Sequence, residues 1–328
     1  MLPSLPTLTR TPARRLARLA TVALAAACAL PAGADPVAQE RGQAAEEAER
    51  VERELGVRPM RFEDLQPYDR RVSASELAAA TQAPVNLQPF PALFDDAARY
   101  DEASLWREGG VIQLIVTSPL SSHDGYGARR IFMTCGGNRH AILQAAGRFA
   151  RTATEAALLA RNPSEQATTG PSPSVEMVEA WWTPPGKPNA AIQDLCDRAK
   201  PAPYALAVPI SFRNGEVLSV PVRSIRKTRD GQGVGWVQLR HLPEAAPHPA
   251  WDAPDAPTEQ LLHLAQMLSP AMYAVNCATG DVRGASLQYS RSLKLVIPGL
   301  WPDDGKHVRD LVKPLAIGSM FSCSAVGL

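Results

Sequence analysis

The sequence has no long hydrophobic run, no excess of charge of either sign and few aromatic residues. Its 328 residues include 34 Lys and Arg against 33 Asp and Glu, and 6% are aromatic. The balanced charge argues against a protein that binds nucleic acid through a net positive field. The longest apolar run, Leu19 to Leu30, is well short of the roughly 20 residues that a membrane-spanning helix needs. We therefore expect no nucleic-acid partner and no transmembrane segment, while 45% hydrophobic residues provide for a folded core.

The sequence also lacks the short motifs of common enzyme classes. It has no H-E-x-x-H, no C-x-x-C, no G-x-S-x-G and no phosphate-binding loop. The best catalytic candidate is His123 beside Asp124, with Ser121 and Ser122 nearby. Because a base and the carboxylate that orients it rarely come from adjacent residues, we interpret Asp124-Gly125 as a hairpin turn. The six histidines share no metal-ligand spacing, so no catalytic residue, cofactor or metal site is expected.

The first 34 residues have the pattern of a signal peptide. Four arginines precede the apolar run, and Ala32-Gly33-Ala34 forms a small-residue cleavage site before Asp35. The mature chain is therefore predicted to be periplasmic or secreted. An alternative is lipid attachment at Cys28, but the leucine that such a signal needs three residues before the cysteine stands four before it.

Residues 35–84 are predicted to be a charged helical segment and linker. Asp35 is a possible N-cap for a helix that runs to Leu55 and stops at Gly56. Ala44, Ala48, Val51 and Leu55 form one narrow apolar stripe. We interpret this helix as a solvated tether, with docking on a partner or on a second copy as the alternative. A second short helix is predicted after residue 72.

The most informative feature is an internal repeat anchored on cysteines. The matched landmarks are Ser104 to Arg107 with Ser224 to Lys227, Gly109-Gly110 with Asp230-Gly231, Val111 to Thr117 with Val234 to Leu239, Cys135 with Cys277, Leu143-Gln144 with Leu287-Gln288, Trp182 to Lys187 with Trp301 to Lys306, and Cys196 with Cys323. Four cysteines allow three disulfide pairings, and a duplicated unit should repeat its own bridge. The repeat therefore predicts the bonds Cys135–Cys196 and Cys277–Cys323.

The runs between the landmarks predict an α+β fold with two tandem small antiparallel sheets, each packed with a helix. The runs 111–117 and 234–239 are typical of strands bounded by glycine turns. Helices are predicted at 150–160 and 258–268, and the two disulfide-bonded units span 85–200 and 201–328. Most tryptophans lie at repeat landmarks and are expected in the core, whereas Trp251, among prolines, is the best candidate for an exposed contact.

The first unit resembles a known family. The motifs are Val85-Asn86-Leu87, Ser104-Leu105, the Gly-Gly turn, Ser118-Pro119, Gly127-Ala128, Cys135, Trp181-Trp182 and Cys196. They resemble the cryptic neisserial protein family of small exported proteobacterial proteins and are similar to the surface-adhesin E-like domain. The resemblance covers about residues 85–200 and, more weakly, 201–328. The first unit begins with an extended lead-in that contains Pro84, Pro89 and Pro91, and such prolines are expected to be absent from the second unit. It implies an antiparallel sheet with a packed helix, export and no known catalytic site, and adhesin E is associated with binding host extracellular-matrix proteins.

The sequence thus predicts an exported, non-enzymatic binding or structural module of the bacterial cell envelope. Its partner would be a protein or another envelope component. Two alternatives remain open at this stage: a cell-envelope hydrolase that uses His123, and a lipid-anchored surface adhesin.

Overall fold

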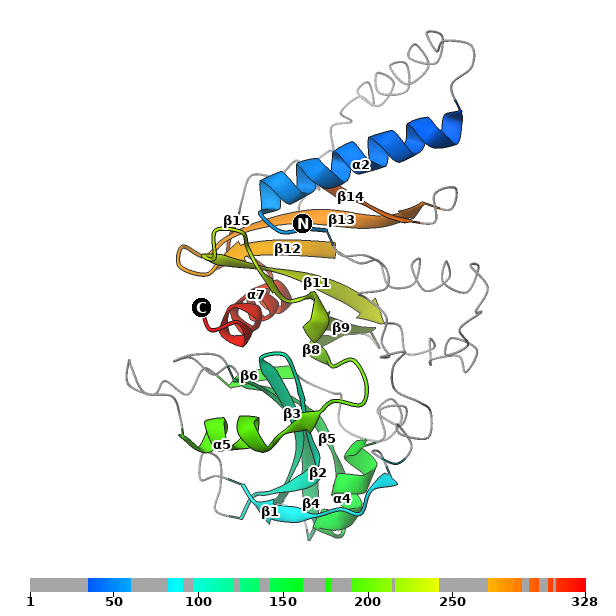
Figure 1. Cartoon of the computed structure of the whole chain (residues 1–328). Helices are drawn as coiled ribbons and strands as arrows, with labels where there is room; N and C mark the ends of the chain where they lie inside the picture. Colours follow the sequence, from blue (N-terminus) through cyan, green and yellow to red (C-terminus); the bar gives the residue numbers. More distant parts are fainter. Residues whose placement is uncertain are drawn as a thin grey trace, which may run out of the picture. The chain divides into compact units, whose positions relative to one another are not determined.

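Two antiparallel sheets with helices on both faces make up most of the computed structural model (Figure 1). Residues 44–328 belong to one compact unit. The structure describes residues 35–59, 79, 82–90, 97–120, 124–135, 142–161, 175–178, 190–213, 216–241, 271–290, 295–300, 306–308 and 311–328. Several predicted features lie outside these residues: the signal peptide, the helix at 258–268, and the proline-rich segment with Trp251. Of the short helix predicted after residue 72, the structure describes Ala79, which is helical.

The first sheet has the order β1-β2-β3-β4-β5-β6, and β7 pairs with β2 in parallel. Its strands are β1 (Leu87–Pro89), β2 (Arg99–Glu108), β3 (Val111–Pro119), β4 (Tyr126–Thr134), β5 (Ile142–Ala150), β6 (Val175–Val178) and β7 (Lys200–Pro201). The predicted strand at 111–117 is confirmed as β3. Gly109 adopts a φ of 55° in the turn before it, a conformation that glycine adopts without strain.

Two helices cover opposite faces of the first sheet. Side chains alternate along a strand, so Ile112 and Leu114 pack under α5 (Ala190–Arg198) while Ile115 packs under α4 (Ala153–Arg161). The prediction that a helix begins at residue 150 is wrong, because that residue still belongs to β5. The helix begins where the Thr152 hydroxyl accepts a hydrogen bond from the backbone N–H of Glu155 (3.2 Å).

The second sheet has the order β14-β13-β12-β11-β9-β8, with β10 beside β11 and β15 beside β13. Its elements are β8 (Ala207–Arg213), β9 (Glu216–Pro221), the 3-10 helix η4 (Val222–Ser224), β10 (Arg226–Lys227), β11 (Gly233–His241), β12 (Ala271–Asn276), β13 (Asp281–Ser290), β14 (Leu295–Leu300) and β15 (Lys306–His307). The predicted strand at 234–239 is confirmed as the central part of β11.

The helices of the second sheet come from distant parts of the chain. One face packs against α7 (Lys313–Ala325), and the other packs against the end of α2 (Pro36–Leu55). The predicted start and end of α2 are confirmed, since Asp35 Oδ1 accepts the N–H of Val37 (3.0 Å) and Gly56 has a φ of 66°. The prediction of a solvated tether is wrong for its last three turns. Val51 and Leu55 are buried against β11, β12 and β13.

The predicted repeat recurs in the strand register. The matched backbone pairs are Leu87–Asp101 with Ala207–Pro221, Arg99–Thr117 with Ser219–Leu239, Trp106–Gln113 with Arg226–Gly235, and Val111–Thr134 with Gly233–Asn276. The strands β9 and β10 together therefore correspond to β2. The 3-10 helix η4 lies where the ladder of β2 is irregular, between Asp101 and Trp106.

Two of the matched landmark pairs were aligned wrongly. The carbonyls of Gly110 and Gln232 accept the backbone N–H of Cys135 and Cys277, so Gly109-Gly110 corresponds to Gly231-Gln232, one residue later than the predicted match with Asp230-Gly231. The second wrong match is that of the two Leu-Gln pairs. Leu143 pairs with Phe132, three residues before Cys135, whereas Leu287 lies past the last residue of β13 that pairs with β12. The two Leu-Gln pairs are therefore not equivalent. Each Leu-Gln pair follows its cysteine at a similar distance in the sequence, but the strand register at the two pairs is different.

The lead-in of the second sheet does contain an equivalent proline. Pro89 pairs with Arg99, and Pro209 pairs with Ser219, which holds the same place in the repeat. Sequence alone concealed this match because no cysteine or turn lies close enough to align the two prolines. The landmarks at 182–187 and 301–305 lie outside the described residues.

Candidate functional site at the junction of the two sheets

The four predicted cysteines form the two predicted disulfides. Cys135 bonds to Cys196 with Cα atoms 6.0 Å apart, and Cys277 bonds to Cys323 with Cα atoms 5.7 Å apart. Each bond joins the end of a strand, β4 or β12, to a helix on the sheet, α5 or α7. Disulfides persist in oxidising compartments, so the pair indicates a protein that resides outside the cytoplasm.

The described structure does not include the other residues that the sequence singled out. Trp251 and His123 both lie outside the described residues. Within the described ranges no group of three or more His, Cys, Asp or Glu could hold a metal ion. Among the helices of those same ranges, none has the length and apolar character to cross a membrane.

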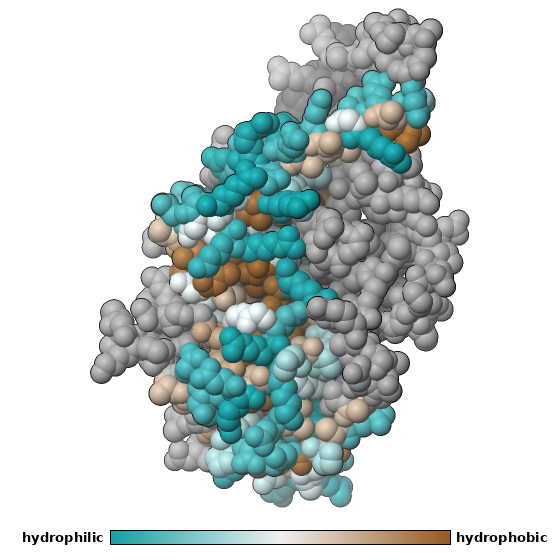
Figure 2. Space-filling view, in the orientation of Figure 1, coloured by the Kyte–Doolittle hydropathy of each residue, from teal (hydrophilic) through white to brown (hydrophobic). Residues whose placement is uncertain are grey.

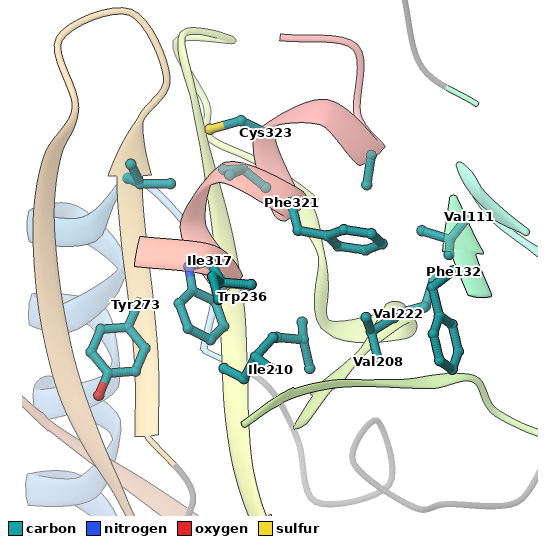
Figure 3. Close-up of a cluster of buried hydrophobic side chains, with 14 of the residues drawn as sticks. Val111, Phe132, Val208, Ile210, Val222, Trp236, Tyr273, Ile317, Phe321 and Cys323 are labelled. Carbon is teal, nitrogen blue, oxygen red and sulfur yellow. The ribbon is translucent and has the colours of Figure 1, made fainter. Parts of the chain in front are cut away.

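The largest buried cluster joins the two sheets. Figure 3 shows Phe321 of α7 pointing toward Val111 and Phe132 of the first sheet, with Val208 and Val222 of the second sheet beside them. All five side chains are buried in one cluster. The end of α7 also lies close to the Gly109-Gly110 turn, where a Cβ on Gly110 would stand 1.9 Å from the Ala325 carbonyl oxygen. The two sheets therefore share a core, which we call the junction.

A carboxylate ties the second sheet to the end of β2. One oxygen of Glu108 accepts the backbone N–H of Leu206 (2.6 Å), and the other accepts Arg223 Nε (2.5 Å). Both charged side chains are about one-fifth to one-quarter exposed. Charge-assisted hydrogen bonds of this kind are stronger than those between neutral groups. Glu108 thereby binds both the lead-in to β8 and the residues of η4.

A tyrosine also crosses the junction. Gln113 Nε2 donates to the Tyr204 hydroxyl (3.0 Å), and the ring of Tyr204 meets Trp106 edge to face with centroids 5.0 Å apart. Burial raises the pKa of Tyr204, an effect that Arg130 and the Gln113 hydrogen bond oppose. The phenol is thus neutral over the physiological range and serves as a hydrogen-bonding partner.

A buried charge pair belongs to the first sheet alone. Asp101 of β2 and Arg161, the last residue of α4, are almost fully buried, and Arg161 Nε donates to Asp101 Oδ2 (2.7 Å). The other Asp101 oxygen accepts the N–H of Asn86 (3.1 Å), and the guanidinium also donates to the carbonyls of Ala83 and Pro84. Together these bonds join α4 to β2 and hold the segment before β1 on both.

Sequence reasoning missed these charged residues. Asp101 is followed by Glu102 in β2, and the sequence does not show which of the two carboxylates is buried. Glu108 and Arg223 are 115 residues apart and carry no local signature. Since each group bonds to a neighbouring element, the arrangement can hold segments together and keep the sheets in register.

The described residues in Figure 2 form a mostly hydrophilic surface. Figure 2 shows hydrophobic residues gathered in the middle of the view, where Figure 1 places α7. This helix has little polar surface, and Met320 is 47% exposed while Val312 at its start is 66% exposed. A largely apolar helix at a surface is unusual unless something covers it.

No protein-family model matches the chain, and neither a curated protein nor a solved structure matches it.

Proposed function

We propose that the protein is an exported, non-enzymatic binding or structural module of the bacterial cell envelope, with a signal peptide over residues 1–34. The observation that carries the proposal is the use of the buried and partly buried charged groups. Asp101, Arg161, Glu108 and Arg223 bond to neighbouring elements of the fold. Side chains held this way stabilise a scaffold, whereas a reactive site needs groups aimed at a substrate position.

The two disulfides support the same proposal. A protein outside the cytoplasm loses access to the machinery that refolds proteins there, so crosslinks that keep each helix on its sheet favour a long-lived shape. The resemblance to the surface-adhesin E-like domain suggests the class of partner, a protein of an extracellular matrix. The apolar exposed residues near α7 are consistent with a protein-binding surface.

The test uses the purified oxidised protein and immobilised extracellular-matrix proteins, with a denatured, reduced and alkylated sample as the control for shape. Saturable binding by the oxidised protein alone supports the proposal. If neither sample binds, and the oxidised protein hydrolyses envelope polymers in a way that His123→Ala abolishes, the hydrolase alternative replaces it. The intact mass of protein from native envelopes completes the test, because a chain that begins at Asp35 fits export by cleavage and an acylated chain that begins at Cys28 fits a lipid-anchored adhesin.

A further inference from the structure

The repeat shows that α2 packs on the second sheet at the position where α4 packs on the first sheet. Ile115 of β3 and Val237 of β11 are equivalent, because the backbone N–H of each donates to the hydroxyl of an equivalent serine, Ser104 or Ser224. Ile115 packs under α4, and Val237 packs under the end of α2. The end of α2 therefore does for the second sheet what α4 does for the first.

The two helices differ in how the chain holds them in place. α4 begins three residues after β5 ends, so its own sheet delivers it. In the second sheet only residues 291–294 separate β13 from β14, which is too short for a helix. The helix comes instead from the other end of the chain, with all of the first sheet between Val57 and β8. Neither disulfide connects it to the second sheet.

The end of α2 packs on a surface of the second sheet that we call the seat. This surface is specific for α2. Val51, Leu55 and Val57 are each at most 4% exposed. Val57 lies over Gly235 of β11, where a Cβ would stand 2.7 Å from the Val57 Cγ1 atom. This close approach needs a residue without a side chain at position 235.

Polar contacts at the edge of the seat fix the direction of the helix. Glu52 pairs with Arg229, and Glu54 Oε2 lies 3.5 Å from Arg283 Nη1. The backbone N–H of Arg229 also donates to the Gly56 carbonyl (3.0 Å). The seat thus combines apolar contacts, a glycine that makes room for Val57, and charged residues at its edge. Only a segment like α2 matches all three features.

We propose that α2 exchanges between molecules, so that a second copy of this chain can place its α2 on the second sheet and form a reciprocal dimer. The contacts in the exchanged dimer would be the same as within one chain, so exchange costs little beyond the loss of free motion. Residues 60–81 join α2 to the first sheet, and 22 residues can span up to about 75 Å. The chain is thus long enough to reach a neighbouring molecule.

The first experiment uses the full chain with a photo-crosslinking amino acid at position 54, which faces Arg283. This chain is mixed with an isotopically heavy chain that has no crosslinker, incubated at rising concentration and irradiated. Exchange predicts crosslinks from the light α2 to heavy peptides of β13, in proportion to a dimer seen by sedimentation equilibrium. If every crosslink stays within one light chain up to the solubility limit, exchange does not occur and the proposal fails.

A complementation experiment tests the seat itself. Val51→Asp damages α2 but leaves the seat intact, and Gly235→Val blocks the seat but leaves α2 intact. Each variant alone should unfold at a lower temperature than the natural chain. An equimolar mixture should recover a fraction of molecules with the natural midpoint, because the intact α2 of one variant fills the open seat of the other. No recovery in a mixture of two folded variants would overturn the proposal, and if either variant fails to fold, the crosslinking experiment on the natural sequence decides.

Discussion

Ser104 and Ser224 show how single residues make the two sheets equivalent. Each is fully buried, and each hydroxyl donates to the carbonyl three residues earlier, that of Asp101 or Pro221 (2.7 Å in both). Each also accepts a backbone N–H from the central strand, that of Ile115 or Val237. The strand ladder is interrupted at both places, and the serine replaces the missing carbonyl.

Ser104→Ala and Ser224→Ala should each lower the free energy of unfolding by about 1–3 kcal/mol, because a buried N–H and a carbonyl lose their partner. Denaturant unfolding of the oxidised protein measures the loss. Ser286→Ala is the matched control, since its hydroxyl makes one partly buried bond to the Gly299 carbonyl (3.3 Å) and should cost less. Equal losses in all three variants would show that the two serines have no special role.

The burial of Tyr273 should make the fold less stable at alkaline pH. Its ring stacks on Trp236 with centroids 4.8 Å apart, and burial raises its pKa to about 12 from the usual 10. The folded state prefers the neutral phenol, so this contribution is complete below pH 10 and disappears as the pH rises toward 12. It amounts to about 2–3 kcal/mol. Urea unfolding across that range measures it, and Tyr273→Phe should flatten the decline; an unchanged decline would assign the effect to other groups.

At the scale of elements, α7 is held by close packing as well as by its disulfide. Gly318 lies against the buried ring of Trp236, and a Cβ there would stand 2.6 Å from the ring atom Cη2. Trp236 cannot move away easily because Tyr273 stacks on it. The helix therefore approaches β11 closely only because position 318 has no side chain.

Gly318→Ala should lower the free energy of unfolding by about 1–3 kcal/mol through overpacking. Gly42→Ala is the control, because it also lies in a helix but has open space around it. There the substitution should raise helix stability by up to about 1 kcal/mol. Both values come from urea unfolding, and a gain in stability at Gly318 would mean that the contact with Trp236 relaxes freely.

The disulfides should contribute to each sheet separately. They close loops of 61 and 46 residues, for which the loss of chain entropy in the unfolded state is on the order of 4 kcal/mol. Replacing both cysteines of one pair by serine should increase proteolysis mainly at α5 or at α7, the helix that the bond holds. Limited proteolysis with mass spectrometry locates the cuts. Identical cut sites in the two variants would mean that the bonds do not act locally.

Several elements could be predicted because their signals are local. Short β-branched runs between glycine turns predict β3 and β11, and the Asp35 cap with Gly56 predicts the ends of α2. The apolar stripe of α2 showed that one face needs burial, but no stripe says which surface will bury it. Its seat depends on a sheet that forms from residues more than 170 positions later.

At the scale of the whole molecule, the cysteine repeat predicted two similar sheets but not how they join. The junction depends on contacts such as Glu108 with Arg223 and Gln113 with Tyr204, each about 100 residues apart in the chain. No spacing in the sequence predicts such pairs. The repeat does not predict them either, because it relates contacts within one copy to contacts within the other, and these contacts join the two copies. The contacts of the junction are therefore what distinguishes this molecule from two independent copies of the unit.

The natural chain should unfold in one cooperative transition, because the junction couples the two sheets through a shared core. Glu108→Ala removes the acceptor of the Leu206 N–H and leaves Arg223 without its carboxylate, which should cost about 1–3 kcal/mol. Because Glu108 connects the two sheets, its removal weakens the coupling between them. Calorimetry should therefore show the single transition broaden or divide into two. Glu102→Ala is the control, because its contacts, a 3.8 Å pair with Arg198 and a hydrogen bond from Asn86, are both exposed and should contribute little. A natural chain that already unfolds in two steps, or a Glu108→Ala chain that keeps one sharp step at an unchanged temperature, would show that Glu108 does not couple the sheets.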